Sequence, residues 1–323
     1  MRIYTNTHIR FMPTKPIDEL FPPLDSNIKL TLKQFSALID ETMAFGTNVL
    51  DWHMKSAKGG NEVAPISLLF RHILELLGAV SSCVKNSNID PCKILMRATL
   101  ESFLGLAYLL KEDSVRRGFA FLAVEAHQRL KLVRMLDPST PEGVRFQKAL
   151  ESDTVAPGYS HGISPELIKL SISRTEDFLN TPGVKSALDE LRKVRKKNKN
   201  PNWYSLYGGP TSIAQLADYL GYQSLYLVFY KFWSRTTHGV DIIQGKLAMG
   251  STGRPGIIQL RVPTDAQTMA QLAITVALRT FRLVVDKYCP EKKPQVTEWY
   301  EAEIMTRYLE LGEHKFINVI IPT

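Results

Sequence analysis

Polar side chains recur at every fourth position in the stretch Tyr226-Leu-Val-Phe-Tyr230-Lys-Phe-Trp-Ser234-Arg-Thr-Thr-His238-Gly-Val-Asp241. A four-residue spacing places side chains in one gently drifting row along an α-helix. The polar row here consists of Tyr226, Tyr230, Ser234 and His238. The other residues are largely apolar or aromatic, so the pattern predicts a helix that is buried nearly all round. Buried polar groups need hydrogen-bonding partners, and the row is therefore expected either to join helices or to line a site.

Helical periodicity extends from this stretch over most of the chain. Apolar residues at three- and four-residue spacing predict helices over 31–50, 65–84, 90–111, 114–136, 165–170, 181–197, 211–220, 223–237 and 264–288. Asp90 followed by Pro91 is a start signal for the third helix, with the aspartate as N-cap. Thr211 or Ser212 is the expected N-cap of the 211–220 helix, and Gly221 ends it. A polar, proline-bearing zone over 137–162 interrupts the helical pattern.

Strand character is confined to the C-terminal part of the chain. The segments Gly256–Val262 and Lys315–Ile321 carry it, and we expect them to pair as a small ribbon. The sequence therefore predicts a mainly all-α fold, a multi-helix bundle with a small β element near the C-terminus. Three parts are expected: an irregular N-terminal arm over 1–27, a helical bundle domain with the polar network over 28–241, and a third part over 242–323. In the third part, a Gly-rich loop, a strand, a long helix and a C-terminal strand would pack on the bundle.

Composition narrows the functional classes. The chain has 323 residues, 44% of them hydrophobic, and three cysteines without Cys-x-x-Cys spacing, which argues against a disulfide framework and a zinc site. No stretch approaches the roughly 18 uninterrupted apolar residues of a membrane span, and the N-terminus lacks an apolar signal core. We therefore expect a cytoplasmic protein without membrane contact. No metal or cofactor is expected, because metal-ligand spacing, phosphate-loop, Gly-x-Gly-x-x-Gly, Gly-x-Ser-x-Gly and His-Glu-x-x-His motifs are absent.

Positive charge is concentrated in one short run. The net charge is +8, and the run Arg192-Lys-Val-Arg-Lys-Lys-Asn-Lys199 has six cations in eight residues. Such a run is either a solvated surface segment or a phosphate-binding one. In the second case RNA would contact Arg192, Lys193, Arg195, Lys196 and Lys197, without any reading of base sequence.

A second polar pair lies in the stretch Ile94-Leu-Met-Arg97-Ala-Thr-Leu-Glu101-Ser-Phe-Leu-Gly-Leu-Ala-Tyr108. Arg97 and Glu101 are one helical turn apart, so they can pair side to side. Their neighbours are apolar, which indicates that the pair faces inward or into a groove. A buried ion pair is weak evidence of stability, because desolvation offsets its attraction. We interpret the pair as one that binds a ligand or holds another group.

Taken in order, these motifs resemble a bacterial family of all-helical proteins known as a domain of unknown function. The resemblance covers roughly 35–241 and rests on Arg97-x-x-x-Glu101, Tyr108-Leu109, Trp203, Ile213-x-x-Leu216-Ala217-x-x-Leu220-Gly221 and the polar row. It implies a helical bundle in which the arginine, glutamate, serine and histidine converge. More distantly, the chain is similar to the HEPN helical ribonucleases, which dimerise and cleave RNA without metal through an arginine and a histidine four to six residues apart. Trp233 stands five positions before His238 here, so Arg97 would have to supply the cation.

The ribonuclease resemblance implies a role for each polar residue. His238 would move protons at the ribose 2′-hydroxyl and the leaving oxygen. Arg97 would stabilise the charge on the phosphorane, and Glu101 would orient Arg97 or act as partner base. Ser234 completes the expected catalytic set, and substrate would be bound by Tyr226, Tyr230, Arg235 and the basic run.

A non-catalytic reading of the same residues is the alternative. The chain would then be a ligand-binding or protein-interaction module, and the Arg, Glu, Ser and His network would be structural. The expected partners are RNA or a nucleotide, a second copy of the chain, or another protein of a defence or toxin system.

Overall fold

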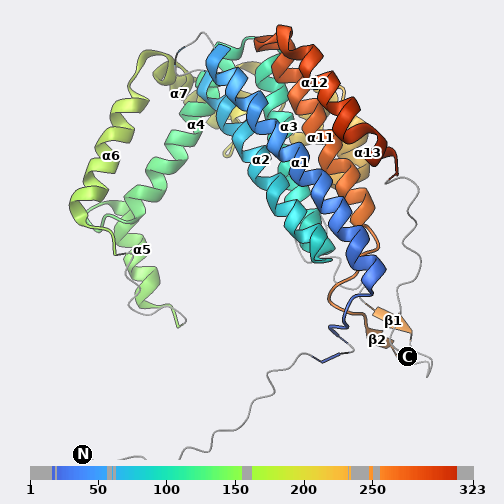
Figure 1. Ribbon diagram of the computed structural model, residues 1–323. Coiled ribbons are helices and arrows are strands. Elements are labelled where there is room, and N and C mark those ends of the chain that lie inside the picture. Colours follow the sequence, from blue (N-terminus) through green and yellow to red (C-terminus); the bar gives the residue numbers. More distant parts are fainter. Residues whose placement is uncertain are drawn as a thin grey trace, which may run out of the picture.

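The computed structural model describes residues 17–18, 20–56, 60, 63–154, 162–231, 233, 247–249 and 255–310. Four long helices that lie side by side form its main core (Figure 1). They are α1 (Ser26–Ser56), α2 (Ala64–Lys85), α3 (Ile89–Lys111) and α11 (Ala266–Tyr288). Each contributes a fully buried phenylalanine to this core, namely Phe35, Phe70, Phe103 and Phe281. The expected mainly all-α fold is confirmed.

Close approach of α1 to its neighbours depends on a missing side chain. A Cβ atom at Gly46 of α1 would lie 2.5 Å from Leu74 of α2 and 2.8 Å from the Phe281 ring of α11. Real Cβ atoms do not come so close to other heavy atoms, so glycine is what permits this packing distance. The sequence pattern predicts which helix faces are apolar, and Gly46 determines how closely α1 approaches α2 and α11.

A second helical group packs around α4 and has a smaller core of its own. It consists of α4 (Ser114–Met135), α5 (Pro141–Glu151), α6 (Pro165–Leu179) and α7 (Pro182–Arg195). Figure 1 shows α4, α5 and α6 leading away from the four-helix core. Small residues on α4 let α7 approach, and the buried set includes Ala120, Ala123, Val184, Ala187 and Leu191.

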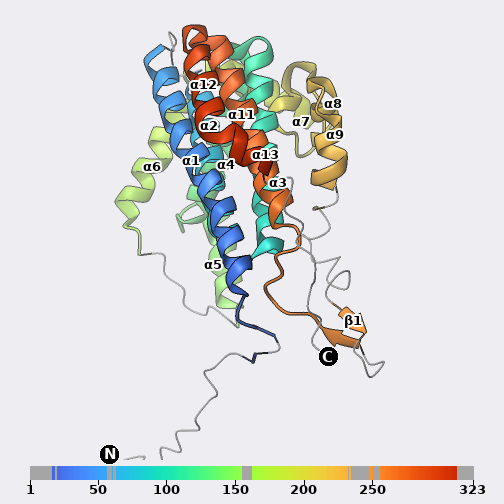
Figure 2. The same cartoon turned by 45° about the vertical axis from the view of Figure 1, so that its right-hand side comes forward.

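Shorter elements cover α3 and α11. They are η2 (Trp203–Gly208), α8 (Ile213–Leu220), α9 (Gln223–Leu225), the π-helical turn η3 (Tyr226–Tyr230), η4 (Pro290–Lys292), α12 (Lys293–Trp299), the π-helical segment η5 (Tyr300–Met305) and α13 (Thr306–Glu310). Figure 2 shows α8 and α9 beside α3. The C-terminal helices return to α1, where Trp299 stacks on Phe45 with ring centroids 3.8 Å apart and Arg307 pairs with Glu41.

The β element is smaller than expected and pairs differently. Strand β2 (Pro255–Ile257) pairs antiparallel with β1 (Leu247–Met249), with Leu247 opposite Ile257. Beyond Ile257 the chain leaves the ribbon, and the amide of Leu260 donates to the carbonyl of Leu20. The predicted strand over 256–262 is therefore too long, and its predicted partner, Lys315–Ile321, lies outside the described residues.

The predicted helices are found as far as the structure describes them, with three corrections. Of the helix predicted over 223–237, residues 232 and 234–237 lie outside the described residues. The polar zone over 137–162 contains α5, because Thr140 accepts from the amide of Gly143 as an N-cap and a proline follows it. Helix α3 begins two residues earlier than Asp90 predicts, with Asn88 as N-cap. The C-terminal helices α12 and α13 were not predicted, because their sequence has no clear apolar periodicity. The division into three parts stays a prediction.

The helix that carries the polar row is less buried than its composition indicates. Leu227 and Val228 are 45% and 53% exposed, while Tyr230 is buried. The expectation of burial nearly all round is therefore wrong. The π-helical turn over Tyr226–Tyr230 changes which side chains face α3, and pattern counting assumes an unbroken α-helix.

Two of the core helices, α2 and α11, are long and apolar enough to cross a membrane by length and composition. This differs from the sequence expectation of no candidate membrane span. Both bury one face in the four-helix core. Core helices pass the same test, so this is weak evidence for a membrane span.

Candidate functional site

Polar side chains follow one face of α3. Arg97, Glu101, Tyr108 and Glu112 recur at spacings of four, seven and four residues, which keeps them on the same side of the helix. This side meets α8 and η3, and Trp203 of η2 packs against it at Gly105. Two groups of side chains form along it: the Arg97 cluster, and a pocket near the C-terminal end of α3.

The Arg97 cluster consists of Arg97 and Glu101 on α3 and Tyr230 on η3. The Tyr230 hydroxyl accepts a hydrogen bond of 2.8 Å from Arg97 Nη2 and donates one of 2.7 Å to Glu101 Oε1. Arg97 Nε lies 3.3 Å from Glu101 Oε1, and the guanidinium carbon is 4.5 Å from the centre of the Tyr230 ring. The predicted Arg97–Glu101 pair is thus present, and a residue of the polar row joins it from another helix.

Burial differs across the Arg97 cluster. The Arg97 side chain is 17% exposed and Glu101 is 46% exposed, so the pair lies near the surface and not in the core. Arg97 Nε is itself buried without a hydrogen bond, although it is within ion-pair distance of Glu101. The carboxylate of Glu101 is thus more accessible to a ligand or solvent than the guanidinium of Arg97.

Protonation is set mainly by burial. Desolvation, followed by the hydrogen bond to Glu101, raises the pKa of Tyr230 to about 12. Desolvation, followed by the nearby charge of Glu101, also raises the pKa of Tyr204 to about 12. Both phenols therefore keep their protons at neutral pH, and Tyr230 donates its proton to Glu101.

The remaining members of the polar row are only partly described. Tyr226 stacks on Tyr230, with ring centroids 5.3 Å apart and an angle of 24° between the rings. Ser234, Arg235 and His238 lie outside the described residues. The structure thus brings together Arg97, Glu101 and Tyr230, with Tyr226 stacked beside them, and the roles assigned to all seven residues stay predictions.

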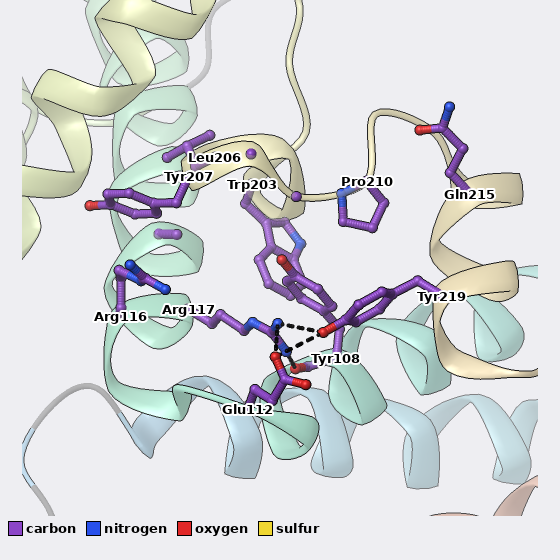
Figure 3. Close-up of a pocket in the computed structure, with 13 residues that line it drawn as sticks. Tyr108, Glu112, Arg116, Arg117, Trp203, Leu206, Tyr207, Pro210, Gln215 and Tyr219 are labelled. Carbon is purple, nitrogen blue, oxygen red and sulfur yellow. Dashed lines mark hydrogen bonds and ion pairs between the residues drawn. The ribbon is translucent and has the colours of Figure 1, made fainter.

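A pocket that the sequence did not indicate lies farther along α3 (Figure 3). Its volume is about 490 Å³, and we call it the Arg117 pocket. Its lining comes from α3, α4, η2, the loop after η2, and α8. The lining residues include Tyr108, Glu112, Arg116, Arg117, Trp203, Tyr207 and Tyr219. Arg117 has a low exposed fraction of 13% for its side chain.

Arg117 is held by three neighbours. Its Nη1 donates to the carbonyl of Tyr108 over 2.6 Å, and its Nη2 donates to the hydroxyl of Tyr219 over 3.0 Å. Its guanidinium carbon lies 3.7 Å from the centre of the Tyr108 ring. Glu112 completes the group, since its Oε2 accepts from the Tyr219 hydroxyl and lies 3.5 Å from Arg117 Nη2. These contacts fix the guanidinium at the wall of the pocket.

The loop that covers the pocket has an unusual backbone. Tyr207 has a φ of +58°, which is rare for a residue with a side chain, and Gly208 follows with a φ of +76°. A Cβ atom at Gly209 would overlap the carbonyl of Tyr204 and lie 2.5 Å from the hydroxyl of Tyr108. Strained backbone of this kind persists where packing holds it, often at binding sites.

Comparison with known proteins adds one finding. Residues 63–244 match a family of unknown function, DUF5677. The chain belongs to the DUF5677 family. The match confirms the expected membership of a helical family of unknown function and says nothing of the HEPN ribonucleases. No curated protein and no solved structure matches the chain.

The DUF5677 segment contains both candidate sites. It runs from the start of α2 to beyond η3, and so includes the Arg97 cluster and the Arg117 pocket. Helices α1 and α11, which complete the core around α2 and α3, lie outside the matched residues. Both sites are therefore built from segments that belong to the family match.

The basic run of the DUF5677 segment lies at the end of α7. Arg192 and Lys193 pair with Asp189 and Glu190 of the same helix. Arg195 Nη1 is 2.7 Å from His127 Nε2 of α4. Burial, followed by the positive charge of Arg195, lowers the pKa of His127 to about 4, so this imidazole is neutral and accepts from the arginine. Lys196 and Lys197 are exposed, and α7 packs on α4, η2 and α6.

In the described part of the chain, no group of three or more His, Cys, Asp or Glu side chains is close enough to hold a metal ion. The cysteines Cys83, Cys92 and Cys289 are free thiols.

Proposed function

We propose that the protein is a metal-independent endoribonuclease that acts at the Arg97 cluster. One observation carries the proposal: the Tyr230 hydroxyl joins Arg97 and Glu101 across two helices. These hydrogen bonds connect η3, which carries the first residues of the polar row, to α3, which carries Arg97. Ser234 and His238 follow Tyr230 by four and eight residues in the sequence.

The proposed reaction needs a cation, a proton-transfer group and a route for RNA. Arg97 binds the scissile phosphate through the N–H groups that the cluster leaves unused, and stabilises the charge of the phosphorane. His238 takes the proton of the 2′-hydroxyl, whose oxygen attacks the adjacent phosphorus. The bond to the 5′-oxygen of the next nucleotide breaks, that oxygen takes up a proton, and a cyclic phosphate remains.

The other residues position the substrate. Glu101 keeps Arg97 oriented, Ser234 and Arg235 contact phosphate oxygens, and the basic run of α7 holds flanking RNA. A second copy of the chain completes the nuclease as a homodimer. Such an activity would serve a defence or toxin system.

A cleavage assay tests the proposal. A fluorescently labelled single-stranded RNA is incubated with wild type, His238→Ala and Arg97→Gln in buffer that contains EDTA. Wild type should cleave it, and each variant should lose at least about 100-fold in rate. His72→Ala is the matched control, because His72 is an exposed histidine on α2 and should keep full activity.

Circular dichroism and thermal unfolding separate loss of chemistry from loss of fold. Folded variants that cleave as fast as wild type would sink the proposal. So would a wild type that leaves RNA intact at every concentration tested.

A non-catalytic binding or interaction module is the second candidate, and the closure of the Arg97 cluster favours it. The Tyr230 hydroxyl bonds to both Arg97 and Glu101, and the phenol keeps its proton. Under this function, Arg97→Gln lowers stability and no variant changes the RNA. Mass in solution separates the two functions further, since the nuclease proposal requires a dimer.

A further inference from the structure

Two of the three charged residues that line the Arg117 pocket are cations, Arg116 and Arg117, and the third is Glu112. Glu112 lies 3.5 Å from Arg117, and Asp113 lies 2.7 Å from Arg116. Two further cations lie outside the lining. Lys111 lies over the ring of Tyr219, and Lys287 donates to Ser114 at the start of α4.

Tyrosine rings hold these cations without neutralising them. Arg117 lies 3.7 Å from the centre of the Tyr108 ring, Lys111 lies 4.0 Å from that of Tyr219, and Arg116 lies 5.1 Å from that of Tyr207. A ring attracts a cation through its quadrupole but has no net charge. The rings therefore leave the cations charged, and an anion in the pocket would compete only with Glu112 and Asp113, whose side chains are 63% and 41% exposed.

Lys287 lies near this group of cations. The pKa of Lys287 is lowered, first by desolvation and then by the positive charge of Arg117.

The remainder of the pocket is planar and aromatic. Trp203, Tyr207 and Tyr219 line it together with the Gly208-Gly209-Pro210 loop, whose backbone approaches closely because Gly209 has no side chain (Figure 3). The volume of about 490 Å³ lies within the usual range for small-molecule sites, about 300 to 1,000 Å³. A ligand that fits these surfaces combines a flat ring system with an acidic group.

We propose that the Arg117 pocket binds a phosphorylated nucleoside, with its phosphate on Arg116 and Arg117 and its base among the aromatic side chains. Arginine forks match phosphate oxygens, and aromatic rings accept any base through stacking. The same chemistry is present in a free mononucleotide and in one residue of an RNA strand. This binding requires no cleavage at the Arg97 cluster, so it goes beyond the proposed function.

Calorimetric titration tests the ligand class. The ligands are the four ribonucleoside 5′-monophosphates, the matching nucleosides, ribose 5-phosphate and inorganic phosphate. At least one mononucleotide should bind with a Kd below about 1 mM. Its nucleoside and ribose 5-phosphate should each bind at least about tenfold more weakly, because each lacks one of the two recognised parts.

Two variants and a matched control assign the binding to this pocket. Arg117→Gln and Arg116→Gln should each weaken binding at least about tenfold. Arg117 also holds the backbone of Tyr108, so Arg116→Gln, at a more exposed side chain, is the variant that decides if Arg117→Gln fails to fold. Arg71→Gln is the control, since Arg71 is an exposed arginine paired with Glu75 on α2.

Competition with a single-stranded RNA hexamer distinguishes the two sources of the nucleotide. If the hexamer displaces the mononucleotide, the pocket takes a residue of an RNA strand; if it does not, the pocket takes a free nucleotide. Binding that survives Arg116→Gln, a nucleoside that binds as tightly as its nucleotide, or no binding by any mononucleotide overturns the proposal. The His238→Ala variant should bind the mononucleotide as tightly as wild type does. Mononucleotide binding at the Arg117 pocket therefore stands even if the nuclease proposal fails.

Discussion

Replacing Tyr230 with phenylalanine removes one oxygen atom that two charged groups share. The hydroxyl accepts from Arg97 and donates to Glu101 at 2.8 and 2.7 Å. The ring remains, and with it the stacking on Tyr226 and the contact with the Arg97 guanidinium. The substitution therefore tests the hydrogen bonds with little change in packing.

The expected cost follows from the exposure of the two partners. A hydrogen bond to a charged group contributes about 1.5 to 3 kcal/mol to stability. Glu101 is 46% exposed, so water replaces much of what it loses, whereas Arg97 is only 17% exposed and loses a partner that water cannot easily replace. The residual ion pair between Arg97 and Glu101 limits the loss further. We expect Tyr230→Phe to lower the free energy of unfolding by about 2 kcal/mol.

This contribution should depend on pH in one direction. The pKa of Tyr230 is raised from 10.0 to about 12 in the folded protein. A raised folded pKa gives stability that is fully present below the unfolded pKa and is lost as pH rises through the folded one. The difference between wild type and Tyr230→Phe should therefore be constant at neutral pH and shrink between pH 10 and 12.

Urea unfolding followed by circular dichroism measures the difference. Tyr226→Phe is the matched control, because it removes a phenolic oxygen from the same turn and keeps the stacked ring, and we expect it to cost less than about 0.5 kcal/mol. A double-mutant cycle with Glu101→Gln should give a coupling of about 1 kcal/mol. Equal, small effects of Tyr230→Phe and Tyr226→Phe would refute the view that Tyr230 joins the two helices energetically.

Three further predictions concern other parts of the molecule. The pKa of His127 is lowered from 6.5 to about 4, so stability should be lost as pH falls from 6.5 to 4, and His127→Gln should flatten that part of the curve in urea unfolding. Gly209→Ala should cost more than about 3 kcal/mol in thermal unfolding because its Cβ meets backbone, whereas Gly208→Ala, with open space but positive φ, should cost about 1 kcal/mol. Gly46→Ala should cost about 1 to 3 kcal/mol by overpacking the core, and Gly78→Ala, which meets only a methionine side chain, should cost less; equal costs at the two positions would contradict the packing argument.

Helices of the core could be predicted because their information is local. Apolar residues on one face of α1, α2, α3 and α11 repeat at helical spacing. The bounds of α2, α3 and α11 were expected to within two residues, whereas α1 begins five residues before and ends six residues after the expected 31–50. Helix α5 was missed because the proline and polar content of its segment indicates a loop. The order of Thr140 and Pro141, however, is that of an N-cap followed by a proline at the first helical position. The π-helical turn before Tyr230 could not be anticipated, since no spacing rule announces it.

The pairing of Arg97 with Glu101 was likewise determined by the sequence, because residues four apart on a helix are neighbours whatever surrounds them. Its partner Tyr230 was singled out as polar, but the contact across more than a hundred residues is a tertiary fact. The Arg117 pocket could not be predicted from the sequence. Its residues come from α3, α4, η2 and α8, and although Tyr108 and Trp203 belong to the motifs of the resemblance, nothing in their own segments indicates a shared pocket. Chain folding alone brought them together, because desolvation, ring contacts and the space left by Gly209 exist only between packed elements.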